Sequence, residues 1–335
     1  MVDIAADAQA DAIKFQSFKS TNIVTDASAK APYQLRNTQV TESQLAMLQS
    51  LELSEEEHFV LSKRCNQKGI EFLSTPFDND SVDLLSKRIS VRRLKIPSGE
   101  VTNGPLLLKV AETQLPIILS TGMSTIPEIE EALSILAYGL STNRRSQPSR
   151  TGFRQAFASN QGQQTLQKQV TLLHCTTEYP APVEEANLRA INSLKERFCL
   201  PVGLSDHTLG TTVAIAAVAR GAVVIEKHFT TSRTLPGPDH LSSLEPDELV
   251  LLINQIRIVE NALGDGVKQP TPSELRNISI ARRSIVAAQN IMEGETLTNT
   301  NLAIKRPGSG RSPMDFWDLV GKTATRSYRR DDQIE

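Results

Sequence analysis

The feature that most restricts the fold is a regular alternation of short apolar runs with helix-length segments. Seven such runs begin at Ala12, Ile70, Arg92, Leu115, Val170, Leu200 and Ala222. Parallel strands need a crossover connection, usually a helix, so this alternation predicts one parallel sheet. Polar residues recur where the runs end, which is where a (β/α)₈ TIM barrel carries its active site. The predicted fold is therefore α/β, of the TIM-barrel type.

A closed barrel of this type has eight strands, and the chain supplies seven. Residues 1–10 have the composition of the last turns of a helix. We therefore expect a TIM barrel that lacks its first strand in this chain, and we expect the missing strand to precede Met1.

The sequence also predicts the domain boundaries. Residues 1–264 form the barrel domain, in which the Gln-, Ser- and Arg-rich stretch 141–168 is predicted to be a polar surface insertion. Residues 265–275 have the Pro, Gly and polar composition of a linker. Residues 276–335 alternate β-like runs with turn signals, which predicts a small β-rich domain.

One local expectation concerns the connection after the first run. Residues 19–43 are predicted to be a polar loop, and residues 42–68 a single helix. Ser54 and Glu57 have the spacing of a capping box and would lie within that helix. Gly69 is placed to end it.

Composition excludes several classes of function. The net charge of −2 gives no general attraction to nucleic acid, and 4% aromatic residues are too few for base-stacking platforms. The chain has no apolar run of about 18 residues and no signal peptide. Its three cysteines form no CxxC pair and no disulfide framework. We therefore expect a cytoplasmic protein without nucleic-acid or membrane partners.

Two histidines end consecutive apolar runs. His207 follows the run from Leu200, and His228 follows the run from Ala222. Carboxyl ends of neighbouring parallel strands meet at one edge of a sheet, and imidazole suits Zn, Mn, Fe and similar ions. Asp206 and Asp239 add oxygen ligands or supporting partners nearby. The alternative is two unrelated histidines, each satisfied by a hydrogen bond. Acids beside both histidines, and Gly/Pro loops after them, favour a shared divalent metal site.

The other strand ends carry lysines and hydroxyls, namely Lys14, Lys95, Ser98, Ser120, Thr177 and Ser205. Lysines as point charges and hydroxyls as donors suit a phosphate or phospho-carboxylate. Either lysine could instead pair with Glu100 or Asp78, and a Schiff-base role is also open. Together with a metal, the set indicates a barrel in which a cation polarises one oxygen and lysines hold a small anion.

These residues lie in motifs that resemble the N-acetylneuraminate (sialic acid) synthase family. The motifs occur in family order across nearly the whole chain. The most specific are GLSDHTLG (203–210), EKHFT (226–230) and GPDHLSSLEP (237–246). The others are AIKFQSFK (12–19), FLSTPFD (72–78), LKIPSGE (94–100), ILSTGMS (118–124), LLHCTTEYPAP (172–182), RRSIVA (282–287) and KRPGSG (305–310). Residues from 284 onward resemble the start of the family's SAF (antifreeze-like) domain.

The resemblance implies a reaction. Phosphoenolpyruvate condenses with an N-acyl hexose to give a nine-carbon 2-keto sugar acid and phosphate. The hexose is N-acetylmannosamine or a di-N-acylated trideoxyhexose that leads to legionaminic or pseudaminic acid. His207 and His228 would hold Mn²⁺ or Mg²⁺.

The family's motifs also assign roles to single positions. The positions that match phosphoenolpyruvate-binding ones are Lys14, Lys95, Ser98, Ser120, Thr177 and Ser205. Those that match sugar-facing ones are Gln16, Thr75, Phe77, Tyr179, Asp239 and Arg306. The expected catalytic side chains are Glu100, Tyr179 and Asp239.

The resemblance further implies a homodimer in which each SAF domain caps the partner's barrel. Arg306 matches an arginine that reaches the sugar's N-acyl group from the partner subunit. The family begins with a strand and loop of AEIGxNHNG type, which this sequence lacks. We therefore expect the chain to be truncated relative to the family, and poorly soluble and inactive without that segment. An inactive remnant, and another metal-dependent barrel aldolase or hydrolase, remain as alternatives.

Overall fold

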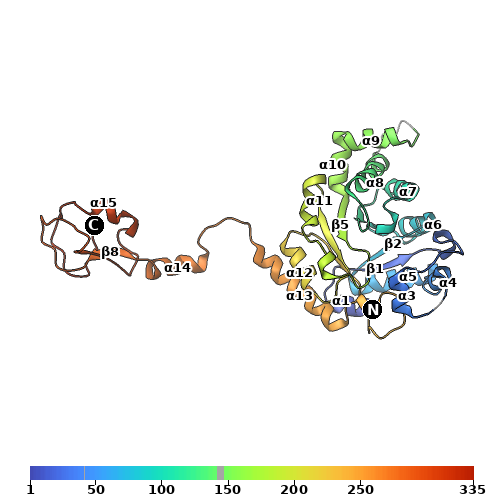
Figure 1. Cartoon of the computed structure of the whole chain (residues 1–335), viewed down its shortest axis with the longest axis horizontal. Coiled ribbons are helices and arrows are strands. Elements are labelled where there is room, and N and C mark those ends of the chain that lie inside the picture. The colour runs from blue at the N-terminus through green and yellow to red at the C-terminus, as the bar shows by residue number, and fades with distance from the viewer. Residues whose placement is uncertain (41, 142–146) are drawn as a thin grey trace. The chain divides into compact units, whose positions relative to one another are not determined.

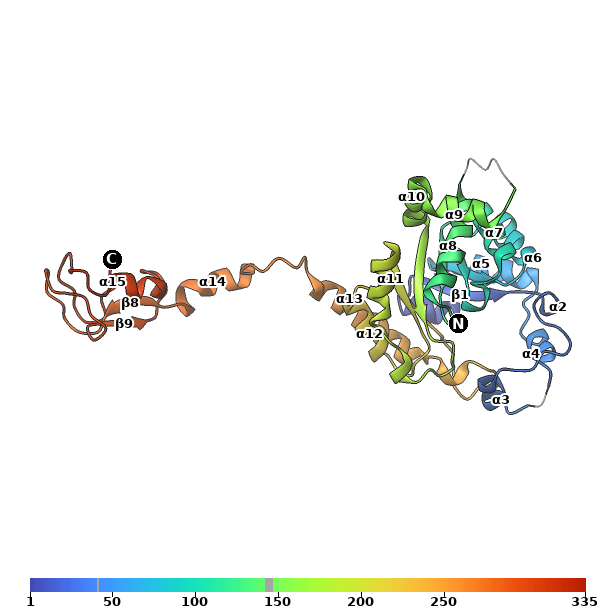
Figure 2. The same ribbon diagram turned by 45° about the horizontal axis from the view of Figure 1, so that its top comes forward.

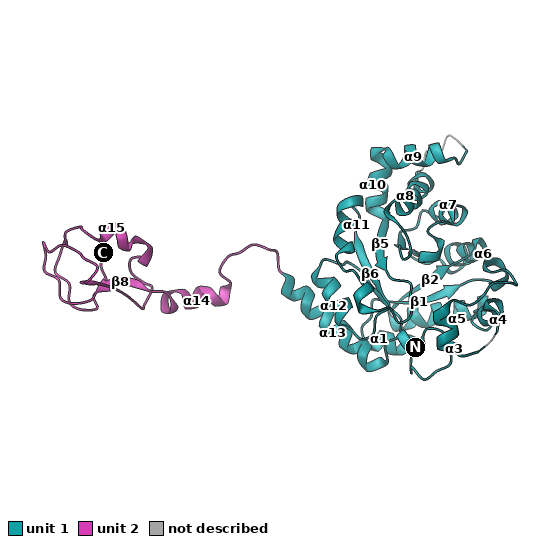
Figure 3. Cartoon of the chain, in the orientation of Figure 1, with its two compact units in different colours: residues 1–263 teal, residues 264–335 magenta. Residues whose placement is uncertain are grey.

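The structure is a computed structural model in which residues 1–40, 42–141 and 147–335 are described. The chain divides into two compact units, Met1–Leu263 and Gly264–Glu335, coloured separately in Figure 3. In the first unit the strands lie inside and the helices surround them (Figure 1).

All seven predicted strands are present and parallel. They are β1 (Ala12–Ser17), β2 (Glu71–Pro76), β3 (Leu94–Ile96), β4 (Ile117–Ser120), β5 (Val170–Cys175), β6 (Val202–Asp206) and β7 (Ile225–Lys227). β3 to β7 form one sheet in chain order, and β1 pairs with β2. This confirms the predicted α/β barrel-type fold, and it brings all seven carboxyl ends to the same side.

The interior of the strand ring is packed with side chains. Leu73, Ile118 and Leu173 form a buried cluster with the partly buried Val224, so β2, β4 and β5 each contribute one apolar residue and the residue just before β7 contributes the fourth. A second and larger cluster lies between the strands and the surrounding helices, and includes Leu119 and Leu172. The interior between the strands is therefore a packed core with an apolar floor.

The helices mostly follow the predicted alternation of strands and helices. In the first unit they are α1 (Val2–Asp7), α2 (Ser20–Ile23), α3 (Pro32–Thr38), α4 (Gln44–Gln49), α5 (Glu55–Lys68), α6 (Asn79–Asp83), α7 (Gly104–Glu112), α8 (Ile126–Leu140), α9 (Arg150–Ala158), α10 (Asn160–Gln169), α11 (Ala190–Phe198), α12 (Thr212–Ala219) and α13 (Pro246–Leu263). No helix in the described residues is long and apolar enough to cross a membrane.

The prediction of a single helix over residues 42–68 was wrong, because the capping box of Ser54 and Glu57 begins a separate helix at Glu55. The Ser54 hydroxyl accepts the Glu57 amide hydrogen, and the Glu57 carboxylate accepts the Ser54 amide hydrogen. These reciprocal bonds satisfy the amides at the start of α5, so α4 and α5 are separate helices. The expected loop at 19–43 also contains α2 and α3, which stand out in Figure 2.

The insertion expected as a polar loop also proved partly helical. Residues 142–146 lie outside the described part, but α9 and α10 follow, each capped by a serine, Ser149 or Ser159. Leu166 on α10 is buried in the main core. The ring centroids of Phe153 on α9 and Tyr138 on α8 are 5.2 Å apart. A few apolar residues in an otherwise polar sequence are enough to attach these helices to the barrel.

The second unit is a small β-rich domain with a core of its own. β8 (Ser284–Ala287) and β9 (Leu302–Lys305) pair antiparallel, and α15 (Phe316–Leu319) follows them. Ile285, Ile291 and Leu302 are among its buried residues. α14 (Pro272–Ala281) precedes β8, so the end of the expected linker at 265–275 is helical.

Candidate active site

His207 and His228 meet at the mouth of the strand ring. Each immediately follows its strand, β6 or β7, and their ring centroids are 5.2 Å apart. The Thr176 carbonyl can only accept a hydrogen bond, and it lies 2.6 Å from Nδ1 of His207. That contact places the His207 proton on Nδ1 and leaves a lone pair on Nε2 for a ligand.

Both imidazoles are neutral at physiological pH. Burial, helped by the neighbouring imidazole, lowers the pKa of His207 to about 4. Burial, helped by the Lys14 ammonium, lowers the pKa of His228 to about 4 as well. Neutral imidazole is the metal-binding form. The pair therefore fits two ligands of a divalent cation.

No group of three or more His, Cys, Asp or Glu side chains in the described residues is arranged to hold a metal. A cation bound here would take its protein ligands from the two imidazoles and keep other positions open. Open positions are what a catalytic, rather than structural, metal site requires.

Tyr179 and Asp239 border the histidine pair. The Tyr179 ring centroid is 4.1 Å from that of His207 and 5.3 Å from that of His228. Asp239 Oδ2 lies 3.6 Å from His228 Nδ1. Burial raises the pKa of Tyr179 and that of Asp239 above their usual values. Two of the three side chains expected to be catalytic are thus brought to the histidines.

Lys14 and Lys95 converge on a carboxylate that the sequence analysis gave no role. Lys95 Nζ is 3.1 Å from Glu226 Oε1, and Lys14 Nζ is 3.9 Å from Oε2. The Ser205 hydroxyl donates to the same Oε1 at 2.7 Å. Burial would raise the pKa of Glu226, but the two ammonium groups and this hydroxyl outweigh it and hold the pKa far below its usual range. Glu226 precedes His228 by two residues, so strand alternation alone would have placed it on the same face.

Three of the predicted hydroxyls are buried without a partner. The hydroxyl oxygens of Thr75, Ser120 and Thr177 accept or donate no hydrogen bond in the structure. Buried polar groups are almost always paired, so unpaired ones at a strand-end mouth indicate a missing ligand. Thr75 and Ser120 stand at the ends of β2 and β4, which pair with the strands that carry Lys14 and Lys95, and Thr177 follows the end of β5.

Gly122 lies beside two of the predicted hydroxyls, those of Ser98 and Thr177. Its amide donates to the Ser98 hydroxyl at 2.9 Å. A Cβ added at Gly122 would lie 2.4 Å from Thr177 Oγ1 and 2.8 Å from Ser98 Oγ. Only glycine therefore lets the turn after β4 approach Thr177 and Ser98, the two residues predicted to bind phosphoenolpyruvate.

Gly122→Ala is expected to weaken anion binding about 10- to 100-fold, because overpacking typically costs 1–3 kcal/mol. The added methyl must push Thr177 and Ser98 away from their places. Titration with phosphoenolpyruvate, followed by calorimetry, measures the loss. Gly99→Ala is the matched control, because a Cβ there has no heavy atom within 4 Å. Equal affinities of the two variants would show that the Ser98–Thr177 spacing is unimportant.

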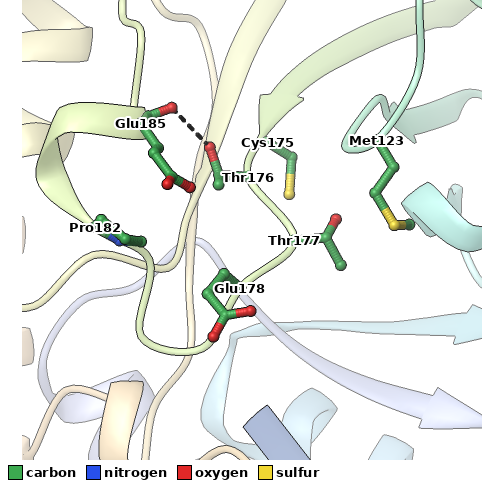
Figure 4. Close-up of a pocket in the computed structure, with 7 residues that line it drawn as sticks. All are labelled: Met123, Cys175, Thr176, Thr177, Glu178, Pro182 and Glu185. Carbon is green, nitrogen blue, oxygen red and sulfur yellow. Dashed lines mark hydrogen bonds between the residues drawn. The ribbon is translucent and has the colours of Figure 1, made fainter. Parts of the chain in front are cut away.

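A cavity of about 620 Å³ opens at the ends of β4 and β5 (Figure 4). Thr177, Cys175 and Met123 line it together with Glu178 and Glu185. The cavity therefore lies beside Thr177, one of the residues whose buried hydroxyl has no partner.

Helix α3 covers part of the mouth and was missed by the sequence analysis. The ring centroids of Tyr33 and Tyr179 are 4.9 Å apart. The Arg36 guanidinium donates a hydrogen bond to Glu178 Oε1 at 2.6 Å. The Asn37 amide donates to the carbonyls of Tyr179, at 3.0 Å, and Pro238, at 2.7 Å. This helix therefore connects the loops that carry Tyr179 and Asp239. The polar composition of 19–43 gave no sign of that role.

The structure places the remaining predicted residues in other contacts. Gln16 is exposed on β1, opposite Thr75 in the strand register. The Phe77 ring packs edge-on against Phe18, and Glu100 accepts a hydrogen bond from Asn103 at 2.7 Å. Arg306 is exposed in the second unit, where its guanidinium donates to the Ala281 carbonyl. Within the described part of the first unit, no hydrogen bond, ion pair or ring contact joins Gln16, Phe77 or Glu100 to the histidines.

Comparison with known proteins supports the resemblance drawn from the motifs. Residues 1–268 match the NeuB family, and residues 282–335 match the SAF domain. The chain is 48% identical to the N,N'-diacetyllegionaminic acid synthase of Campylobacter jejuni, over 100% of this chain and 92% of that protein. It is 30% identical to the N-acetylneuraminate-9-phosphate synthase of Homo sapiens, over 100% of this chain and 86% of that protein.

A solved structure of a sialic acid synthetase is also similar to this chain. The N-acetylneuraminic acid (sialic acid) synthetase of Leptospira borgpetersenii, in complex with citrate, is similar with a TM-score of 0.66 and 34% identity. The match covers 83% of each chain. Fold, motif order and sequence therefore point to one group of proteins.

Proposed function

The chain belongs to the NeuB family, and on this premise we propose that it condenses phosphoenolpyruvate with an N-acyl hexose. The products are a nine-carbon 2-keto sugar acid and phosphate. Carbon 3 of phosphoenolpyruvate bonds to the aldehyde carbon of the sugar. Water adds at carbon 2, and phosphate leaves by cleavage of its C–O bond.

The observation that carries this proposal is the group of unpaired hydroxyls beside two lysines. Thr75, Ser120 and Thr177 have buried hydroxyls without a partner. Lys95 is almost fully buried, and burial lowers its pKa although Glu226 opposes this. Ammonium groups and hydroxyl donors are the partners that a phosphate and a carboxylate need. Phosphoenolpyruvate carries both groups.

The histidine pair supplies the second half of the site. His207 and His228 would hold Mn²⁺ or Mg²⁺, which when bound would polarise the aldehyde oxygen of the sugar. A ligand held by the two rings would lie near the Lys14–Glu226–Lys95 group, because Ser205 and Glu226 lie two residues before the histidines on the same strand faces. Asp239 and Tyr179 lie beside the rings and would contact the sugar hydroxyls.

The sugar is proposed to be a di-N-acylated trideoxyhexose of the legionaminic acid type. The supporting observation is identity: 48% to a diacetyllegionaminic acid synthase, against 30% to an N-acetylneuraminate-9-phosphate synthase. N-acetylmannosamine would undergo the same chemistry. The choice between them therefore depends on side chains around the sugar and not on the reacting groups.

The purified chain is tested with phosphoenolpyruvate, Mn²⁺ and each sugar in turn. Phosphate release that requires a sugar, with equimolar 2-keto acid, supports the proposal. We expect a higher kcat/KM for the di-N-acylated trideoxyhexose that leads to legionaminic acid than for N-acetylmannosamine. Phosphate release without any sugar would indicate a hydrolase, and no turnover with any sugar would indicate an inactive protein.

Arg306 is proposed to complete the sugar site from a partner subunit in a homodimer. It is exposed and follows β9 at the edge of the second unit, where a Pro-Gly turn begins. Mixing an Arg306→Ala chain with a His228→Ala chain should then restore part of the activity, because one composite site in each mixed dimer is intact. A verified mixed dimer without recovery would exclude this exchange.

A further inference from the structure

A buried ion pair lies directly behind the two histidines. Lys227 Nζ is 2.8 Å from Asp206 Oδ2, and the two side chains are 3% and 1% exposed. Asp206 immediately precedes His207, and Lys227 immediately precedes His228. Because successive side chains of a strand point to opposite faces, this pair lies on the face away from the site.

The same carboxylate also fixes the turn that follows β6. Asp206 Oδ1 accepts hydrogen bonds from the amide of Thr208, at 2.9 Å, and from its hydroxyl, at 2.8 Å. The Lys227 ammonium donates to the Thr208 carbonyl. The hydrogen bonds among Lys227, Asp206 and Thr208 thus join the end of β7 to the end of β6 and to the turn after β6. His207 lies between Asp206, the last residue of β6, and Thr208, which take part in these bonds.

The pair also matches the strand register. Asp206 is opposite Lys227, and Ser205 is opposite Glu226. Ser205 and Glu226, which face the site, are also hydrogen-bonded: the Ser205 hydroxyl donates to Glu226 Oε1 at 2.7 Å. A slip of one residue would turn every side chain of one strand to the other face. Both faces of β6 and β7 therefore carry a polar bond that only this register allows.

We propose that Asp206 and Lys227 are positioning residues for the metal site, and that they fix the separation of His207 and His228. This inference rests on the proposed function for the identity of the cation, but its geometric part does not. A buried ion pair adds little net stability, because desolvation offsets the attraction. It does specify one arrangement, since any other leaves a buried charge without its partner.

The test removes the ion pair while keeping the local shape. In the double variant D206N/K227M, the asparagine carbonyl can still accept the bonds from Thr208, and methionine fills the volume of the lysine chain. We expect its Tm to stay within about 3 °C of the parent, because isosteric replacement of a buried pair is close to neutral. We expect its dissociation constant for Mn²⁺ alone, measured by calorimetry, to rise about 10- to 100-fold, as when a supporting partner of a metal ligand is lost.

The single variant K227M separates stability from position. It leaves the Asp206 carboxylate buried without a cation, so its Tm should fall by on the order of 10 °C. The matched control is R93M/E71Q, which removes the cross-strand pair of Arg93 and Glu71 at the other end of the strands. Its affinity for Mn²⁺ should equal that of the parent.

A crystal structure of metal-free D206N/K227M gives a readout that does not depend on the cation. The His207 and His228 ring centroids should lie farther apart than 5.2 Å, or the rings should occupy several positions. An unchanged ring arrangement would overturn the inference, whether or not the protein binds metal. So would an unchanged affinity for Mn²⁺ in a parent that binds it. A parent that does not bind Mn²⁺, together with displaced rings in the variant, would leave the positioning role standing and refute the proposed metal.

Discussion

Replacing His207 or His228 with alanine is expected to lower kcat by at least about 1,000-fold. A cation that polarises a carbonyl is worth several kcal/mol, and each 1.36 kcal/mol corresponds to a factor of ten in rate. Either substitution removes half of the imidazole pair, whose rings are 5.2 Å apart. The measurement is phosphate release at saturating phosphoenolpyruvate, sugar and Mn²⁺, with circular dichroism to show that the fold is kept.

His174→Gln is the control for this prediction. His174 is also a strand histidine, but it lies on β5 with Nε2 bonded to the Ala186 carbonyl at 2.8 Å, away from the pair. Its removal should change kcat by less than about threefold, because no site residue depends on it. If His228→Ala kept a near-parental rate after metal removal and re-addition, the two-histidine site would be excluded.

Lys95→Met is expected to remove activity and to destabilise the protein. The lysine is 3% exposed and bonded to Glu226, so its loss leaves a mostly buried carboxylate with only Lys14, at 3.9 Å, to balance it. Removing one partner of a buried pair typically costs about 3–5 kcal/mol. The KM for phosphoenolpyruvate should rise at least about 100-fold, because a charge-assisted bond to the substrate is lost as well. Thermal unfolding and steady-state kinetics measure the two effects.

The double variant K95M/E226Q distinguishes the two causes. Neutralising Glu226 removes the uncompensated charge, so we expect most of the lost stability to return. Binding of phosphoenolpyruvate should not return, because the ammonium is still missing. Recovery of the KM in the double variant would mean that Lys95 serves only to neutralise Glu226 and does not touch the substrate.

The strands and their polar ends were predictable because both depend on local pattern. A run such as that ending at Ser120 is apolar on both faces, as a strand covered by helices must be. His207 and His228 could be paired from sequence because a parallel sheet brings consecutive strand ends together. The family motifs then added the phosphoenolpyruvate and sugar positions, whose roles stay predictions.

The features that were missed depend on partners distant in sequence. Glu226 looks like any strand carboxylate until Lys14 and Lys95 are placed beside it. Asn37 lies in a polar stretch, and only its contact with Pro238 shows what it connects. Helix α10 is almost wholly polar, and it is held by the burial of Leu166. In each case one tertiary contact decided the structure, and composition did not record it.

The apolar floor inside the strand ring has a kinetic consequence. Leu73, Ile118 and Leu173 fill the space between the strands, so we expect reactants and products to pass through the carboxyl-terminal mouth. Lys95 is 3% exposed, whereas His228 and Asp239, which face the entrance, are 22% and 34% exposed. A sugar held at the histidines would block the route to Lys95. Substrates should therefore bind in a compulsory order, with the anion first, and inorganic phosphate should inhibit competitively against phosphoenolpyruvate.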